Sequence, residues 1–195
     1  ENPESIDNLI VPFKNLLNDA YAKDISKKVK RGEKMEKEKP MLSILKGSGV
    51  FLDDTLSNCK LNSVKANDDT SSWRFCITLD NIITCEKLKE LNEKVSKYIN
   101  QTFNIKNVKF TIDYPQEIKE KYEFIETELK DYFNYAISVC MEVKKGVMIL
   151  NEYHHKFLKN EIMLMVASEE EKKVAEDNLV IIKRFFLNYG FDFVK

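Results

Sequence analysis

The sequence predicts an α+β protein of two small domains, in each of which helices pack on a short mixed or antiparallel sheet. The first observation is the alternation of apolar and polar residues over Trp73–Leu79, the pattern of a strand with one buried face. A helical repeat of apolar residues follows between Leu88 and Phe103, and a second alternating segment covers Val108–Tyr114. This strand–helix–strand unit builds a scaffold and carries no reactive group.

The composition limits the classes of protein to which the chain can belong. Its 195 residues, of which 43% are hydrophobic, are enough for one domain or two small ones with a packed core. Basic and acidic residues number 31 and 32, whereas a dedicated duplex-binding domain is normally much more basic. No apolar run approaches the ~20 residues of a membrane span, and the first residues lack a signal-peptide pattern. The four cysteines show no CxxC spacing, so we expect reduced thiols in a cytoplasmic protein that does not contact membranes.

Residues 1–40 are predicted to form an N-terminal helix and a charged linker. An apolar stripe over Leu9–Tyr21 indicates the helix, with Pro12 in its first turn. The linker is crowded with Lys and Glu and holds too few apolar residues to bury a face. Its basic side chains are candidate contacts for phosphate or an acidic partner. The alternative is a solvated linker, because nearby glutamates reduce the positive charge of the segment. These candidates are Lys27, Lys28, Lys30 and Arg31.

Residues 41–115 are predicted to form the first α+β domain. A strand over Leu61–Ala66 joins the Trp73 strand through the turn 67–70 as a hairpin, and the helix and second strand follow. Lys46–Gly49 is interpreted as a turn, because a phosphate-binding loop needs a strand before it and a helix behind it. Pro115 ends the domain, since the residue before a proline is pushed out of helical geometry.

Residues 116–195 are predicted to form the second α+β domain, in the order helix, helix, strand, helix and strand. A long helix buries apolar residues between Ile125 and Cys140, and a shorter helix covers Val147–Leu158. The strand Ile162–Val166 is apolar on both faces, which predicts that other layers cover it on both sides.

The last helix is clearly delimited in the sequence. Ser168 and Glu171 form a capping box at its start, apolar residues line one face, and Gly190 ends it. Phe191 and Phe193 then begin a strand, so we expect the sequence to be cut from inside a longer polypeptide.

The sequence contains no recognisable catalytic or cofactor-binding motif. Carboxylates that could hold metal ions lie in polar turns or at strand ends, and only Asp80 and Asp113 are placed where they could converge. Cys140 with His154 or His155 would make a nucleophile pair, but a helix break separates them and Cys140 fits a core position. We therefore predict no catalytic, metal or cofactor-binding residue and no cofactor. The other carboxylates considered are Asp53, Asp54, Asp68 and Asp69.

Trp73 has two interpretations. An exposed indole would be suited to stacking on a nucleic-acid base. Because Trp73 shares a face of its strand with Phe75, Ile77 and Leu79, we expect it to lie in the core instead.

Several segments, taken in order, resemble one protein family. They are Leu61-Asn62-Ser63-Val64-Lys65, Ser72-Trp73-Arg74-Phe75, Val108-Lys109-Phe110-Thr111-Ile112, Leu129-Lys130-Asp131-Tyr132, the run from Asn160 to Val166, and Tyr189-Gly190-Phe191. Their order and spacing are similar to those in the N-terminal region of the PolC-type DNA polymerase III α subunit of low-GC Gram-positive bacteria and mycoplasmas. The resemblance covers Leu56 to Phe193, most of the chain.

The resemblance implies a non-catalytic interaction module of a bacterial replicase, with a role in chromosomal DNA replication. The parent protein would be a DNA-directed DNA polymerase with a 3′–5′ exonuclease, whose polymerase and exonuclease motifs lie downstream in the family and do not occur here. The implied partners are other replisome proteins, namely the clamp-loader tau subunit, the helicase or the single-strand-binding protein. The first half is also similar to the C-terminal domain of tau, which is a likeness of fold.

Two alternatives stay open. The chain could be a nucleic-acid-binding module that contacts template or single-stranded DNA through the Lys-rich segment at Lys27–Arg31. It could also be an enzyme in its own right, for which Asp80 and Asp113 would have to belong to a convergent acidic triad.

Overall fold

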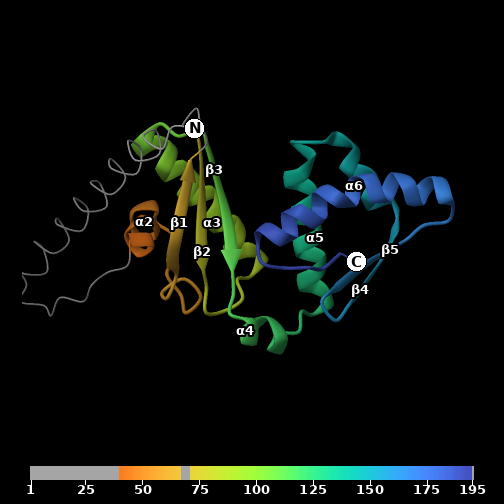
Figure 1. The fold of residues 1–195 in the computed structure, drawn as a ribbon, viewed down its shortest axis with the longest axis horizontal. Coiled ribbons are helices and arrows are strands. Elements are labelled where there is room, and N and C mark those ends of the chain that lie inside the picture. The colour runs from red at the N-terminus through yellow and green to blue at the C-terminus, as the bar shows by residue number, and fades with distance from the viewer. Residues whose placement is uncertain (1–39, 67–70, 195) are drawn as a thin grey trace, which may run out of the picture. The chain divides into compact units, whose positions relative to one another are not determined.

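The computed structural model describes residues 40–66 and 71–194, and their fold is α+β, as the sequence predicts (Figure 1). Among these residues, one compact unit, unit 1, comprises residues 40–81 and 87–111. The other, unit 2, comprises residues 82–86 and 112–194. The predicted domains differ from these units in two places, because the chain passes from one unit to the other within a strand and because residues 82–86 belong to unit 2. The predicted helix at Leu9–Tyr21 and its linker lie outside the described residues.

Unit 1 contains a three-stranded mixed sheet with the strand order β1-β2-β3. β1 (Lys60–Ala66) pairs antiparallel with β2 (Ser72–Thr78), so the predicted hairpin is confirmed. Because the sheet is mixed, β3 (Asn107–Asp113) runs parallel to β2, and the crossover between them is α3 (Cys85–Phe103). The strand–helix–strand unit predicted from the sequence is therefore present, and α2 (Pro40–Ser48) precedes it.

The core of unit 1 lies between the sheet and α3. Trp73 is only 6% exposed, and its ring centroid is 5.3 Å from that of Phe103 at the end of α3. Phe75 stacks on Phe110 of the neighbouring strand with centroids 5.6 Å apart. The prediction that Trp73 lies in the core is confirmed. The alternation of the strands therefore directs their apolar residues toward α3 and their polar residues to the opposite face.

Interpreting Lys46–Gly49 as a turn is wrong for three of its residues. The helix α2 continues to Ser48, and only Gly49, whose φ is 71°, lies beyond it. Gly47 lies within the helix, and a Cβ there would lie 2.8 Å from the Tyr98 ring of α3. Glycine is common in turns, but here it leaves room for the Tyr98 ring inside a helix.

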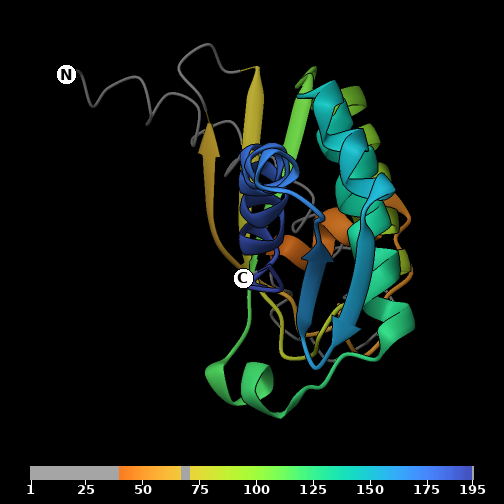
Figure 2. The ribbon, with the colours of Figure 1, turned by 90° about the vertical axis from the view of Figure 1, so that its right-hand side faces the viewer.

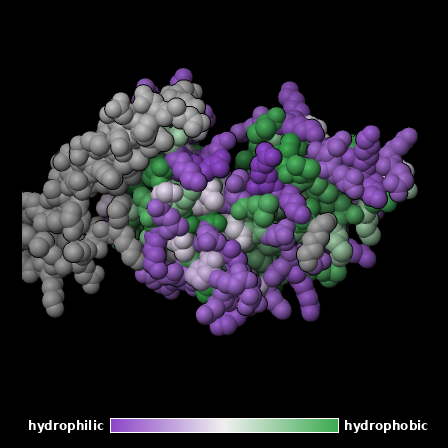
Figure 3. All heavy atoms as spheres, in the orientation of Figure 1, coloured by the Kyte–Doolittle hydropathy of each residue, from purple (hydrophilic) through white to green (hydrophobic). Residues whose placement is uncertain are grey.

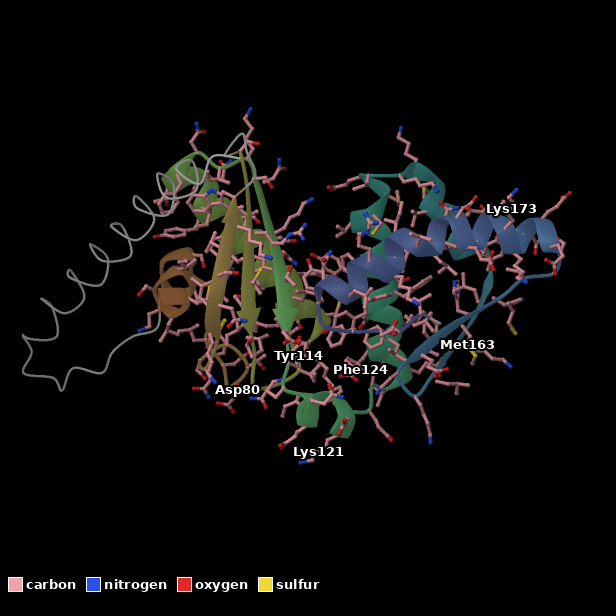
Figure 4. The ribbon with its side chains drawn as sticks, viewed as in Figure 1. Asp80, Tyr114, Lys121, Phe124, Met163 and Lys173 are labelled. Atoms are coloured by element: carbon pink, nitrogen blue, oxygen red, sulfur yellow. The ribbon has the colours of Figure 1, made fainter. Side chains whose placement is uncertain are left out.

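Unit 2 packs its elements around a cluster of aromatic rings. Tyr114 and Phe124, both buried, are labelled among the side chains in Figure 4, and each ring lies within 5.5 Å of the Phe191 ring, centroid to centroid. The buried Tyr132 hydroxyl donates a hydrogen bond to the Ile83 carbonyl, which joins residues 82–86 to this unit. The elements are α4 (Gln116–Lys121), α5 (Glu126–Met141), the 3₁₀-helix η1 (Lys145–Glu152), β4 (His154–Leu158), β5 (Glu161–Met165) and α6 (Glu169–Asn188).

The predicted helix over Val147–Leu158 is wrong in its second half. The 3₁₀-helix η1 covers Val147, but Phe157 and Leu158 belong to β4, which pairs antiparallel with β5 (Figure 2). Lys159 and Asn160 make the turn with φ of 39° and 67°, the left-handed conformation of a tight hairpin. The Asn160 side chain also bonds the main chain between α4 and α5. Its Oδ1 accepts a hydrogen bond from Phe124 N, and its Nδ2 donates one to Tyr122 O.

The prediction that Ile162–Val166 is covered on both faces is also wrong. Ile162 is buried, but Met163 and Met165 on the other face of β5 are exposed. Methionine is apolar yet flexible, and it is tolerated on a solvated strand face. The predicted strand after Gly190 is reduced to one parallel bridge between Val194 and Ile162.

The last helix, α6, begins and ends as predicted. Ser168 Oγ accepts a hydrogen bond from Glu171 N, and Gly190 follows the helix with φ of 78°. Hydrophilic residues cover the first turns of α6 (Figure 3). In the part of the chain that the structure describes, no helix combines the length and the apolar character needed to cross a membrane.

Candidate functional site

The basic residues proposed from the sequence as a phosphate or partner contact lie outside the described residues. They are Lys27, Lys28, Lys30 and Arg31. Their role stays a prediction.

The carboxylates proposed as metal ligands each have lysine neighbours or lie in turns. Asp80 is 3.8 Å from Lys60 Nζ, and Asp113 is 2.8 Å from Lys119 Nζ. Hydrogen bonding to Lys119 lowers the pKa of Asp113. Across residues 40–66 and 71–194, no three His, Cys, Asp or Glu side chains form a group that could hold a metal ion. Asp68 and Asp69 lie outside the described residues.

The sequence offers Cys140 with His154 or His155 as a nucleophile pair, but the hydrogen-bonding neighbours of Cys140 and His155 in the structure are main-chain carbonyls. The Cys140 thiol is buried 4.0 Å from the Ile181 carbonyl, and burial raises its pKa to about 11. His155 Nε2 lies 2.8 Å from the Leu150 carbonyl, which can only accept, so the imidazole donates. Burial lowers the pKa of His155, which keeps the ring neutral. A buried protonated thiol is a poor nucleophile, and Cys140 acts as a core residue.

The Phe51 loop, which we define as residues 49–53 of unit 1, holds an exposed aromatic ring. Phe51 is 69% exposed, whereas Val50 beside it is buried. Phe51 N donates to Glu90 Oε1 over 3.2 Å, and Phe51 O accepts from Lys87 Nζ over 3.1 Å. Lys94 Nζ donates to Gly49 O over 2.9 Å. The main chain of the loop is therefore fixed to α3 on both sides of Phe51.

A chain of alternating charges supports these contacts. Glu90 accepts hydrogen bonds from Lys87 at 2.8 Å and from Lys94 at 2.9 Å, and Lys87 is 3.3 Å from Asp53. The hydrogen bonds from Lys87 and Lys94 lower the pKa of Glu90 from 4.5 to about 2. Burial alone would lower the pKa of Lys87, but the hydrogen bonds to Glu90 and Asp53 outweigh it and raise the pKa. The Glu90 carboxylate and the Lys87 ammonium group thus stay charged at neutral pH.

The ring of Phe51 is itself positioned by this network. Lys87 Nζ lies 5.0 Å from the ring centroid, a distance at which a cation is attracted to an aromatic face. The arrangement offers no nucleophile and no acid–base pair. It presents an aromatic side chain to solvent from a hydrogen-bonded main chain, which is a property of a binding surface.

Sequence reasoning missed the Phe51 loop, and the signal for it is weak. Phe51 follows a glycine and precedes two aspartates, a context that indicates a turn. The i, i+3, i+7 spacing of Lys87, Glu90 and Lys94 indicates a charged stripe on one face of the predicted helix. Nothing in the sequence shows that the stripe contacts the loop.

Comparisons with known proteins do not identify a relative. A scan of protein-family models, a search of curated proteins and a search of solved structures each found no match to this chain.

Proposed function

We propose that this chain is a non-catalytic interaction module in which unit 1 docks a protein partner through the Phe51 loop. The parent that we propose, on the sequence resemblance, is a PolC-type DNA polymerase III α subunit. The chain would then be its N-terminal module and would contribute to chromosomal DNA replication in the cytoplasm by contacting other replisome proteins. On this proposal the module needs no cofactor, and its parent supplies the polymerase and exonuclease activities.

The observation that carries the interaction role is the exposure of Phe51 on a fixed main chain. Aromatic side chains dominate the energetics of protein interfaces, and an anchor that is already positioned loses little entropy on binding. The hydrogen bonds from Glu90, Lys87 and Lys94 provide that positioning.

The candidate partners are purified clamp-loader tau subunit, helicase and single-strand-binding protein. Each is titrated against the full chain and against Phe51→Ala. For the true partner, we expect Phe51→Ala to weaken binding by about thirtyfold or more, as for an aromatic hot spot. Because Phe51 is exposed, the thermal midpoint should change little.

A matched control separates an interface effect from a general loss of apolar surface. Val143→Ala truncates a side chain of unit 2 that is 80% exposed, and it should leave the affinity unchanged. Equal affinities for the wild type and Phe51→Ala would contradict the role of the loop. Absence of binding to all three proteins would contradict the proposed replisome role.

A further inference from the structure

Three cations stand side by side across the polar face of the unit 1 sheet. Lys65 of β1 is the register partner of Arg74 on β2. Asn107 N of β3 donates a hydrogen bond to Ser71 O. In a parallel pair of strands this bond places Asn107 beside Ser72, and two residues further along it places Lys109 beside Arg74. We call Lys65, Arg74 and Lys109 the basic row.

The same register holds on the opposite face of the sheet. One residue further along each strand, Phe75 stacks on Phe110 with ring centroids 5.6 Å apart. Trp73 on that face contacts Phe103 of α3. Because successive side chains alternate, the basic row lies on the face that points away from α3.

The basic row is unneutralised within the described residues. All three side chains are exposed, and none forms an ion pair with another described residue. The carboxylates nearest to the strand ends, Asp80 and Asp113, are paired with Lys60 and Lys119. Asp68 and Asp69, in the β1–β2 turn, lie outside the described residues. Like charges directly opposite in a sheet are destabilising, and a bound anion would relieve that repulsion.

The rest of the polar face favours a phosphate backbone over a protein. The next row contains Ser63 and its partner Cys76, and Thr111 lies beside Cys76 in the same parallel register. Ser63 is exposed, whereas Cys76 and Thr111 are half-buried and the Thr111 hydroxyl is covered. This row therefore has none of the large apolar or aromatic anchors that a protein interface needs. The face has no aromatic residue on which a base could stack. Sugar–phosphate contacts, which Arg, Lys and Ser side chains make, fit the exposed residues of this face best.

We propose that the basic row binds the phosphodiester backbone of single-stranded nucleic acid. The row is one cation wide, so it follows one backbone, whereas a duplex presents two across a groove. Arg74 supplies a planar guanidinium that can hold a phosphate in two hydrogen bonds, and the lysines supply point charges beside it. This site goes beyond the proposed protein-interaction function. It lies on the face of the sheet that points away from α3, whereas the Phe51 loop is hydrogen-bonded to α3.

The experiment compares two variants of the full chain that lose the same charge. The first carries Lys65→Gln, Arg74→Gln and Lys109→Gln together. The control carries Lys173→Gln, Lys183→Gln and Arg184→Gln, which removes two lysines and one arginine from the exposed surface of α6. The probe is a fluorescent oligothymidylate longer than the roughly 4–16 nucleotides that one binding fold covers. Circular dichroism and the unfolding midpoint verify that both variants fold.

For three phosphate contacts on a single strand, the logarithm of the affinity should fall with the logarithm of salt with a slope of about −2. The wild type and the control should therefore lose about twentyfold in affinity between about 50 and 200 mM salt. The basic-row variant should bind at least about tenfold more weakly at the lower salt, with a slope near zero.

Three results would overturn the proposal. The first is no detectable binding of oligothymidylate at low salt, or equal binding by the basic-row variant. The second is tighter binding of a duplex of the same length. The third is binding of polyglutamate with the same dependence on the basic row, which would assign the face to an acidic protein segment. None of these results bears on whether Phe51 docks a partner.

Discussion

Glu90 links the Phe51 loop to both lysines that bond its main chain. It accepts hydrogen bonds from the main chain of Phe51 and from two lysines, so its negative charge is stabilised in the folded state. The pKa of Glu90 is about 2 in the fold, below the ordinary value of 4.5. A carboxylate with a lowered pKa stabilises the fold above its ordinary pKa, and this contribution disappears as the pH falls through the folded pKa.

The first prediction concerns this carboxylate. Glu90→Gln should lower the free energy of unfolding at neutral pH, and the difference from the wild type should shrink as the pH falls from 4.5 toward about 2. Denaturant unfolding at a series of pH values measures that difference. Glu93→Gln, an exposed change on the same helix, should stay within about 0.5 kcal/mol of the wild type. A pH-independent deficit in Glu90→Gln would show that the ionised group is not what fixes the loop.

For single residues, the sequence predicts which way a side chain points better than it predicts which residues the side chain contacts. Alternation places Trp73 inward and Arg74 outward, and the structure agrees on both. The basic row could not be predicted, because strand register decides whether Lys65, Arg74 and Lys109 are adjacent. Register comes from hydrogen bonding between distant segments, which a single sequence does not display.

Among the elements, the turn after α6 is constrained both by its backbone geometry and by its neighbours. Gly190 has φ of 78°, and a Cβ there would lie 2.9 Å from Ile112 O and 2.9 Å from the Tyr114 ring. Left-handed geometry and the lack of space both exclude a side chain. Beyond this turn, the Phe191 ring stacks on Tyr114 in the aromatic cluster of unit 2.

Alanine substitutions at two glycines separate the cost of the left-handed backbone from the cost of the missing space. Gly190→Ala should cost about 2–4 kcal/mol, from backbone strain together with the clash. Gly49→Ala is the matched control, because Gly49 has φ of 71° but no atom within 4 Å of the added Cβ. It should cost only about 1–2 kcal/mol. Equal costs in chemical denaturation would mean that the backbone at Gly190 yields and that contact with Ile112 and Tyr114 is unimportant.

Elements with strong periodicity are the ones that the sequence predicts correctly. The helices α3, α5 and α6 and the strands of unit 1 have one clear apolar face or stripe. The errors fall on short apolar segments, where helix and strand give similar patterns. The sequence does not predict β4, because its turn to β5 is formed by Lys159 and Asn160, two residues that are not a common turn pair.

On the scale of the whole molecule, the two units differ in what they bury and what they expose. Unit 2 is dominated by buried aromatic packing, whereas unit 1 presents the fixed Phe51 ring and the basic row. The Phe51 loop is held by α3, and the basic row lies on the sheet that α3 covers. We therefore propose that unit 1 recognises the partner and that unit 2 has a supporting role.

Hydrogen exchange of the full chain, with and without the partner identified by titration, tests that claim most directly. We expect amide protection on binding at residues 49–53 and at the first turns of α3, where Phe51 N bonds Glu90. Amides of unit 2 should exchange at unchanged rates. Protection confined to unit 2, with residues 49–53 unaffected, would contradict the account.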